Sequence, residues 1–354
     1  MMSLALSALY TLPPETAHHA ALFALEHGLV GARIEPDDLN LKAHVWGLDF
    51  ANPIGLAAGF DKDARVIDAM LGLGFGFVEA GTVTPQPQAG NQKPRLFRLD
   101  EDAAVINRLG FNSGGLKAFT ARLAARRQNP KSAGIVGANV GKNRDTVDGA
   151  ADYVAGIEAV APLADYLVCN ISSPNTPGLR AMQARAPIED LLRRVLAARD
   201  RAVRSAKKPP LLAKVGPDLS PEQLSDIAEV ALATGVDGLI CGNTTIARPS
   251  SLKSKAASEA GGLSGAPLLA PATECLAALY RLTKGAIPLI GCGGVACGAD
   301  AYAKIRAGAS LVQVYSALVF QGPGLANKIK RELAALLRQD GFKTIADAVG
   351  TGPK

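Results

Sequence analysis

Eight short apolar segments, each with glycine, asparagine, serine or threonine at or near its end, recur from about residue 52 and alternate with longer segments of helical period. The segments are continuously apolar rather than alternating, as expected for parallel strands that helices cover. Eight strands is the number in a TIM (β/α)8 barrel, whereas a doubly wound sheet more often has five to seven. We therefore predict an α/β TIM barrel with strands in residues 52–59, 75–82, 134–141, 165–172, 210–217, 237–244, 287–294 and 310–317.

The segments between the strands predict the outer helices and two unusual connections. Residues 189–206 have apolar residues at helical spacing and open with acidic residues, which suit the N-terminal end of a helix. A second helix, with Leu325, Ile329, Leu333 and Leu336 on one face, follows the last strand. Residues 82–134 and 244–287 are longer than one helix and two turns require, so we predict that they contain lids.

The first 45 residues lie outside the repeat. Pro13 and Pro14 followed by an Ala- and Leu-rich segment predict a helix that ends near Gly28, and residues 3–10 can form the other arm of a helical hairpin. A simple lid on the barrel bottom is the alternative at this point. Residues 44–52 predict a short hairpin that plugs the barrel base. We divide the chain into an N-terminal helical extension, 1–45, and a barrel, 46–354.

Composition excludes several classes of protein. The 38 Lys and Arg residues against 32 Asp and Glu leave a mild charge of +6, and aromatic residues are 5%, so we expect no nucleic-acid partner. Five cysteines without paired CxxC spacing favour reduced thiols in a cytosolic compartment. All four histidines lie in the first 44 residues, which argues against a histidine-based triad or metal site in the barrel. No segment has the roughly 20 apolar residues that span a bilayer, and the apolar start lacks the basic region of a signal peptide, so we expect it to be retained.

Polar residues are concentrated where the predicted strands end, which is where TIM barrels carry their chemistry. One asparagine or lysine at such a place is usually structural. Two lysines and three asparagines that converge on one rim need partners in the barrel mouth, because buried polar groups are costly when they are unpaired. In chain order these polar residues are Asp61, Lys62, Asn139, Asn170, Ser172, Ser173, Asn175, Lys214, Asn243, Thr244, Thr245, Tyr315 and Ser316.

Glycines follow the seventh and eighth strands, the usual location of a phosphate site in these barrels. Residues 261–265 form another glycine-rich stretch, although each such loop taken alone can be a tight turn. Together with the amides and the lysine in the fifth strand, they favour a phosphorylated planar cofactor over a metal. A lysine at the N1/O2 edge of a flavin would stabilise the negative charge of the reduced form.

At these residues the chain resembles the class 2 dihydroorotate dehydrogenases, which are membrane-associated and reduce quinones. The resemblance rests on GLAAGFDKD (55–63), EAGTVTPQPQAGNQKPRLFRL (79–99), NRLGFNS (107–113), NISSPNTPGLR (170–180), AKVGPDL (213–219), GNTT (242–245), GGLSG (261–265) and VYSAL (314–318). It implies a flavoprotein barrel that oxidises (S)-dihydroorotate to orotate in pyrimidine biosynthesis. Class 1 enzymes have a cysteine base where this chain has Ser173, so the serine and the N-terminal extension imply class 2.

The resemblance also implies roles for individual residues. Ser173 would remove a proton from C5 of dihydroorotate while C6 delivers hydride to flavin N5, and a relay that the sequence does not show would accept that proton. FMN would contact Ala58, Gly59, Phe60, Asp61, Lys62, Thr82, Asn139, Asn170 and Lys214, with its phosphate against Gly265, Gly293, Gly294, Tyr315 and Ser316. Dihydroorotate would contact Lys62, Asn107, Arg108, Leu109, Gly110, Phe111, Asn170, Asn175, Asn243 and Thr244.

The second half-reaction would use a quinone that enters through a tunnel under the N-terminal helices. His18, Arg98 and Tyr315 match family positions that line this tunnel. The resemblance implies contact of these helices with the membrane lipid surface, and we expect a monomer on the cytoplasmic side of the bacterial inner membrane. Two positions depart from the family: Ser113 replaces an asparagine, and Gly242 stands where a hydroxyl residue precedes the sequence NTT.

Three other functions fit parts of the sequence. A class 1 enzyme would use a soluble acceptor, and Ser173 argues against it. A Schiff-base aldolase would use Lys214 as the nucleophile and would be colourless. A non-catalytic barrel that binds a phosphorylated ligand would tolerate loss of Ser173 or Lys62 without loss of its only function.

Overall fold

The structure is a computed structural model that describes residues 9–352, in which eight parallel strands close into a barrel. This confirms the predicted TIM barrel, and each predicted strand segment overlaps one barrel strand, with β4 and β13 each extending one residue beyond the predicted range. Around the barrel the order is β10, β12, β13, β3, β4, β7, β8 and β9, and β9 pairs with β10. The strands are β3 (Ile54–Leu56), β4 (Phe77–Val83), β7 (Ile135–Val140), β8 (Tyr166–Asn170), β9 (Leu211–Val215), β10 (Gly238–Cys241), β12 (Leu289–Cys292) and β13 (Ala309–Val314).

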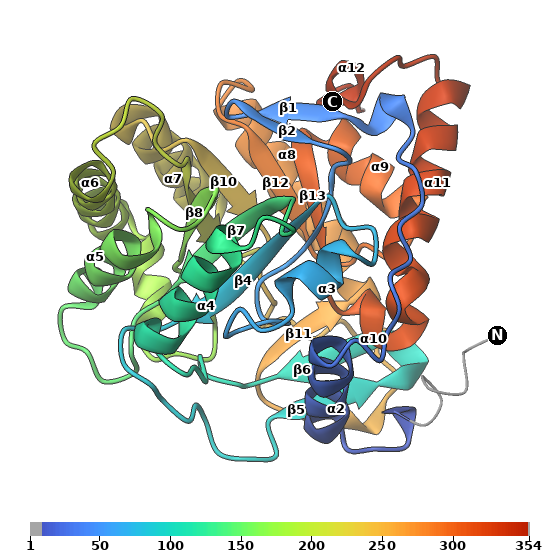
Figure 1. The fold of residues 1–354 in the computed structure, drawn as a ribbon, viewed down its shortest axis with the longest axis horizontal. Coiled ribbons are helices and arrows are strands. Elements are labelled where there is room, and N and C mark those ends of the chain that lie inside the picture. The colour runs from blue at the N-terminus through green and yellow to red at the C-terminus, as the bar shows by residue number, and fades with distance from the viewer. Residues whose placement is uncertain (1–8, 353–354) are drawn as a thin grey trace.

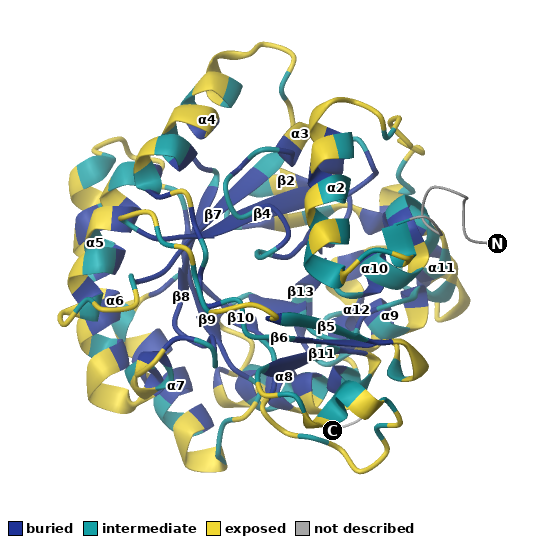
Figure 2. Cartoon of the chain, turned by 90° about the horizontal axis from the view of Figure 1, so that it is seen from below, coloured by how far each residue is buried: buried dark blue, intermediate teal, exposed yellow. Residues whose placement is uncertain are grey.

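Helices surround the barrel, so the strands are buried on both faces. Every residue of β4 is buried, and Figure 2 shows the buried strands at the centre and exposed residues on the outer helices. The continuous apolar character of the strand segments follows from this double burial. The helices are α2 (Pro14–Glu26), α3 (Ile67–Leu71), α4 (Leu116–Gln128), α5 (Gly149–Val160), α6 (Arg185–Ala202), α7 (Pro221–Thr234), α8 (Leu269–Leu282), α9 (Gly298–Arg306), α10 (Ala317–Gln321), α11 (Leu325–Gln339) and α12 (Ile345–Ala348).

The helix boundaries follow local chemistry. In α7, Ser220 and Gln223 form a capping box, Pro221 occupies the first turn, and Gly235 ends the helix at φ 71°. Helix α6 begins at Arg185, four residues before the predicted start, because Pro187 in the first turn needs no hydrogen-bond donor there. The acidic residues expected to open α6 therefore lie in its second turn, and Glu189 pairs with Arg193 at 2.7 Å.

The two long connections contribute a small antiparallel sheet beside the barrel mouth rather than open lids. Strands β5 (Leu96–Leu99) and β6 (Ala104–Asn107) come from the first connection, and β11 (Gly262–Gly265) comes from the second. They pair in the order β11, β6, β5. Ladder hydrogen bonds and a small core around Leu99, Ile106 and Leu263 stabilise this sheet, which forms a fixed wall of the site described below.

The predicted hairpin at the barrel base is confirmed. Strands β1 (Ala43–Val45) and β2 (Leu48–Phe50) pair antiparallel at the end of the barrel opposite α2 (Figure 1). The Trp46 ring stacks on Tyr166 with the centroids 6.4 Å apart, and its indole nitrogen donates to the Asp237 carbonyl at 2.7 Å. Phe50 packs edge-on against Phe77. This apolar cluster closes the base.

The N-terminal segment contacts two different parts of the barrel. Helix α2 packs beside β5 and α3 at the mouth of the barrel (Figure 1), so the alternative of a lid on the barrel bottom is wrong. The chain then runs along α11, where Asp37 pairs with Lys330 at 2.7 Å and Asn40 donates to the Ala334 carbonyl. The boundary proposed at residue 45 falls inside the β1–β2 hairpin. Residues 3–10, the other predicted arm of the helical hairpin, lie mostly outside the described residues.

Candidate active site

A cavity of about 300 Å³ opens at the carboxyl ends of the barrel strands. Its walls come from the loops that follow the strands, from the small sheet β11–β6–β5 and from one face of α2. Nearly all the predicted site residues line this single cavity, although they are distributed over almost 300 positions of the chain. They are His18, Ala58, Gly59, Phe60, Lys62, Thr82, Arg98, Asn107, Leu109, Gly110, Phe111, Asn170, Ser173, Asn175, Lys214, Asn243, Thr244, Gly265, Gly293, Gly294, Tyr315 and Ser316.

Three predicted contact residues do not line the cavity. The Asp61 carboxylate is fully buried and accepts the backbone N–H groups of Arg65 and Val66, so it caps a turn. Burial raises its pKa. The Arg108 guanidinium turns outward to Glu259, at 2.8 Å, and lies over the Phe97 ring. Both side chains therefore have structural partners outside the cavity, and their contacts with cofactor or substrate stay predictions.

Asn139 is the third, and it lies one layer below the cavity. Its carbonyl oxygen accepts from the Thr82 hydroxyl at 2.6 Å, and its amide donates to Glu79 at 2.7 Å. The Thr82 hydroxyl in turn accepts from the Asn170 amide at 2.8 Å. Because these bonds occupy both ends of Asn139, we expect it to support Thr82 and Asn170 rather than to touch a ligand.

The asparagines of the cavity are held by one another. The Asn170 carbonyl oxygen accepts from Asn243 at 3.2 Å and from the Ser172 hydroxyl at 3.3 Å. The Asn175 amide donates to the Asn107 carbonyl oxygen at 3.1 Å, which joins the loop after β8 to β6. Such cross-strand bonds orient the amides before a ligand arrives, which lowers the entropic cost of binding.

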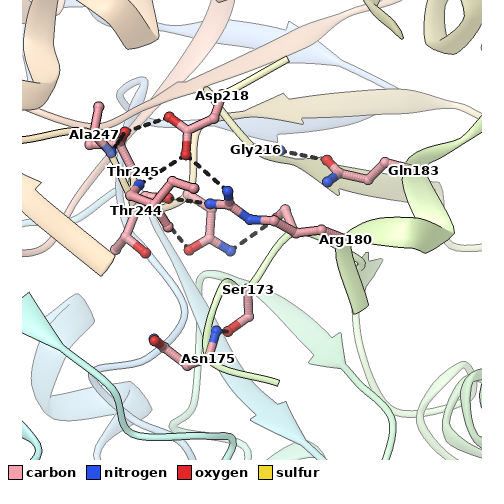
Figure 3. A network of polar contacts seen from close by, with 12 residues as sticks. Ser173, Asn175, Arg180, Gln183, Gly216, Asp218, Thr244, Thr245 and Ala247 are labelled. Atoms are coloured by element: carbon pink, nitrogen blue, oxygen red, sulfur yellow. Dashed lines mark hydrogen bonds and ion pairs between the residues drawn. The ribbon is translucent and has the colours of Figure 1, made fainter. Parts of the chain in front are cut away.

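Ser173 lies in the loop after β8 and is 7% exposed. Its hydroxyl oxygen accepts the Asn175 N–H at 3.3 Å (Figure 3). No histidine, lysine or carboxylate bonds to this oxygen within the part of the chain that the structure describes. The side chain of Thr176 is buried three residues further on, and its hydroxyl has no hydrogen-bond partner among the described residues.

An ion pair that the sequence did not predict ties this loop to its neighbours. Arg180 pairs with Asp218 at 3.0 Å and donates to the Thr244 carbonyl at 3.2 Å (Figure 3). Asp218 also accepts from the Thr245 hydroxyl and from the Ile246 N–H. The two charged residues stand in the family motifs NISSPNTPGLR and AKVGPDL. The spacing of the sequence alone does not show that they meet.

Two lysines face the cavity in different environments. The Lys62 ammonium donates to the side-chain oxygen of Asn112 at 2.5 Å. Burial together with nearby Arg95 lowers the pKa of Lys62 to about 8. Lys214, on β9, is 4% exposed, and its ammonium lies 3.9 Å from the Glu79 carboxylate. Lys62 is suited to bind an anionic group, and Lys214 to stabilise negative charge on a planar ligand.

Glycines form a cradle beside Tyr315 and Ser316. At Gly294 an added Cβ would lie 2.4 Å from the Leu269 backbone, and at Gly265 it would lie 2.4 Å from the Ala103 carbonyl. Both residues have positive φ, of 82° and 98°. Only glycine fits at these positions, and the resulting exposed backbone N–H groups suit a phosphate.

The side of the cavity next to α2 is mainly apolar. The His18 ring packs edge-on against Phe60, with centroids 5.3 Å apart, and Phe60 packs edge-on against Tyr315. Burial and the Lys62 charge lower the pKa of His18 to about 4, so the ring is neutral at physiological pH. Arg98 donates to the carbonyls of Tyr10 and Leu12 and thereby holds the start of α2 at the cavity.

The two departures from the family pattern have different surroundings. The Ser113 hydroxyl accepts two backbone N–H groups, of Thr84 and Gly115, and does not line the cavity. Gly242 lines the cavity at φ 124°, where an added Cβ would lie 2.1 Å from the Cys292 carbonyl. A hydroxyl residue at position 242 would therefore require a local backbone shift.

The fold and the site together define a (β/α)8 barrel of the enzyme class, with one cavity at the carboxyl ends of its strands where polar amides face an apolar wall. Comparison with known proteins shows the family to which the chain belongs. The sequence profile described as dihydroorotate dehydrogenase matches residues 40–337. The chain belongs to the dihydroorotate dehydrogenase family, and its relatives place it in class 2, the quinone-dependent class.

Relatives and solved structures agree over nearly the whole chain. The chain is 63% identical to a dihydroorotate dehydrogenase (quinone) of Xanthobacter autotrophicus, over 95% of each protein. It is 51% identical to the mitochondrial dihydroorotate dehydrogenase (quinone) of Mus musculus, covering 96% of this chain and 87% of the mouse protein. A crystal structure of the Eimeria tenella enzyme in complex with ferulenol superposes with a TM-score of 0.92 at 44% identity, covering 97% and 98% of the two chains.

Proposed function

We propose that this enzyme oxidises (S)-dihydroorotate to orotate in de novo pyrimidine biosynthesis, with FMN as its cofactor and a quinone as the final electron acceptor. The observation that carries the proposal is a single cavity in which Ser173 and Lys62 meet four asparagine amides on one side and an apolar wall on the other. The serine, the lysine and the asparagine amides suit a polar cyclic imide with a carboxylate. The apolar wall suits a hydrophobic acceptor.

The residues of the cavity fit FMN. The glycine cradle would hold the phosphate, with Tyr315 and Ser316 beside it. The Lys214 ammonium has no hydrogen bond within residues 9–352, only the ion pair with Glu79, and would meet the polar edge of the ring system. The unpartnered carbonyl oxygen of Gln313, which also lines the cavity, offers an acceptor for a ring N–H. When bound, the flavin supplies a two-electron acceptor next to the substrate.

Dihydroorotate would lie against the asparagine side of the cavity. Lys62 would pair with its carboxylate, and Asn107, Asn175 and Asn243 would hydrogen-bond the imide ring. The Thr244 hydroxyl, buried and unpartnered among the described residues, would serve as a further group for the substrate. Amides provide both donors and acceptors, which matches the alternating donors and acceptors of a cyclic imide.

Ser173 would act as the base that removes the C5 proton. A serine hydroxyl is a weak base at its ordinary pKa, so it must pass a proton to another acceptor. The unpartnered Thr176 hydroxyl in the same loop is our candidate for the next member of that relay. Closure of the loop over the substrate would exclude bulk water and leave the relay as the path for the proton.

The quinone would enter between α2 and the apolar side of the cavity, near His18, Arg98 and Tyr315. Phe23 of α2 and Leu29 just after it are 53% and 71% exposed, and they would rest on a lipid surface. No helix within residues 9–352 has the length and hydrophobicity to cross a membrane. We propose that the enzyme is a monomer bound peripherally to the cytoplasmic side of the inner membrane.

An anaerobic absorbance experiment tests the proposal. The purified protein should show a flavin band between about 350 and 500 nm that bleaches with dihydroorotate and returns when a short-chain quinone is added. A protein that binds no flavin after FMN is supplied would contradict the proposal. Bleaching without reoxidation by quinone would leave the first half-reaction standing and reject the acceptor.

A further inference from the structure

Glu79 is a carboxylate at the centre of the barrel that the proposed reaction does not use. It lies in β4, within a strand segment that is otherwise apolar, and its side chain is fully buried. A buried carboxylate is costly unless it is hydrogen-bonded and paired. The donors and charges around Glu79 therefore indicate its role.

Three groups donate to this carboxylate from three other strands. Gln313 donates from β13 at 2.6 Å, Asn139 from β7 at 2.7 Å and the Tyr166 hydroxyl from β8 at 3.2 Å. The Thr82 hydroxyl donates to the oxygen of Asn139, which leaves the NH₂ group of Asn139 facing Glu79. Groups from three strands thus face the two oxygens of this carboxylate and satisfy it in the barrel interior.

The positive partner of this carboxylate is Lys214. The ammonium lies 3.9 Å from the nearer carboxylate oxygen, and Glu79 is the one carboxylate within ion-pair distance of it in residues 9–352. Lys214 lines the cavity, whereas Glu79 does not. Within this pair the cation therefore faces the cavity, and the anion lies outside the cavity in the barrel interior.

We propose that Glu79 is a positioning residue that serves as the counter-ion of Lys214 and thereby sets the reduction potential of the bound flavin. This inference rests on the proposed function, because it places the flavin against Lys214. Reduction adds negative charge to the flavin, which Lys214 stabilises and Glu79 opposes at slightly greater distance. The pair also connects to the substrate amides, since Asn139 joins Glu79 to Thr82 and Asn170.

The direct test is the midpoint potential of the flavin in Glu79→Gln, measured by spectroelectrochemical titration from pH 6 to 9. Removing the negative charge should make the potential more positive, because less negative charge then opposes the reduced flavin. We expect at least a tenfold shift in the equilibrium between oxidised and reduced flavin, which corresponds to about 30 mV for two electrons. A potential equal to that of the wild type at every pH, with FMN still bound, would overturn the inference.

The chain offers a matched control in a second buried pair. Lys330 on α11 is 4% exposed and pairs with Asp37 at 2.7 Å, outside the barrel. Asp37→Asn also removes a carboxylate from a buried lysine, so it should cost stability without moving the flavin potential. An equal shift in both variants would mean that the potential reports general loosening of the fold, and it would contradict the specific role of Glu79.

If Glu79→Gln alone loses its flavin, a charge-rescue experiment tests the pairing of Glu79 with Lys214. Lys214→Met leaves Glu79 uncompensated beneath the cofactor and should weaken FMN binding on the order of tenfold or more. The double variant with Glu79→Gln removes that buried charge and should bind FMN more tightly than Lys214→Met alone, by fluorescence titration of the apoprotein. Equal or weaker binding by the double variant would refute the pairing.

These outcomes are separable from failure of the proposed function. The function fails if the wild-type protein binds no FMN or is not reduced by dihydroorotate. The inference on Glu79 fails if the wild type does both and the variants show neither the shift in potential nor the rescue.

Discussion

The two sides of the cavity differ in the interactions that hold their side chains. On the asparagine side, each amide is fixed by a neighbour from another strand, as in the bond from Asn175 to Asn107. On the side of α2, apolar rings such as Phe60 and Tyr315 pack edge-on, and the helix is attached by ion pairs at its margins, such as Glu15 with Arg95 at 2.7 Å. A site built in this way can orient a polar substrate rigidly and still admit a hydrophobic acceptor. It also implies that the two half-reactions can be impaired separately.

The strongest test of this separation is Ser173→Ala. Loss of a positioned base should slow flavin reduction by dihydroorotate on the order of 10²- to 10⁴-fold, and leave FMN binding and reoxidation by quinone near wild type. Stopped-flow measurement of each half-reaction checks this. Ser225→Ala, at a half-buried serine on α7 that does not line the cavity, is the control. An undiminished rate of flavin reduction would remove Ser173 from the role of base.

Deletion of residues 1–30 should produce the converse effect. Losing roughly 100 Å² of apolar contact with the quinone costs about 2.5 kcal/mol, close to 10²-fold in the efficiency of quinone reduction. Flavin reduction by dihydroorotate should change much less. The deletion stops before the segment along α11, because removing Asp37 would leave the buried Lys330 unpaired. Equal loss in both half-reactions would indicate a purely structural role for α2.

Arg180→Ala should affect the asparagine side alone. The guanidinium holds the Thr244 carbonyl and pairs with Asp218, and such charge-assisted bonds contribute about 1.5–3 kcal/mol. We expect kcat/KM for dihydroorotate to fall about 10- to 100-fold, with quinone reoxidation preserved. Arg185→Ala is the matched control, since Arg185 pairs with Asp226 and Glu229 on the outer surface. A comparable loss in that control would show that Arg180 merely stabilises the fold.

The pH dependence of substrate binding should be the mildest effect. Lys62 has a pKa of about 8, below its ordinary value, so its charge is present at pH 7 and is lost as the pH rises through 8. The KM for dihydroorotate should therefore increase by up to about tenfold per pH unit above that point. Lys62→Met should have a raised KM that no longer changes over this range. A KM for the wild type that stays constant from pH 7 to 9.5 would exclude Lys62 as the carboxylate partner.

Much of the site could be predicted because strand ends in a TIM barrel share one rim. Ser173, Lys62, Lys214, Asn170 and Asn243 needed only the strand pattern to be placed together. The strand pattern did not show the direction of side chains that depend on distant partners. Asp61 turned to cap a turn and Arg108 turned to Glu259, and the local sequence around each is silent about those partners.

The local sequence contains a signal for the special environment of Glu79. A lone carboxylate in the apolar segment FGFVEAGT is unexpected on burial grounds and indicates a buried polar partner. Its partners nevertheless lie 60, 87 and 234 positions away. Barrel closure between β3 and β13 brings the ends of the chain together, and only then do Gln313 and Glu79 meet.

Hydrophobic periodicity and turn chemistry are local, so the amino-acid pattern was sufficient to predict the eight buried strands, the rim on which the polar residues gather, and the apolar plug at the base. Three arrangements became visible only in the folded barrel: α2 covers the mouth rather than the base, Arg180 reaches Asp218, and Lys214 lies next to an anion. These arrangements depend on which surfaces pack and which charges compensate one another after the barrel closes, and no local pattern encodes that.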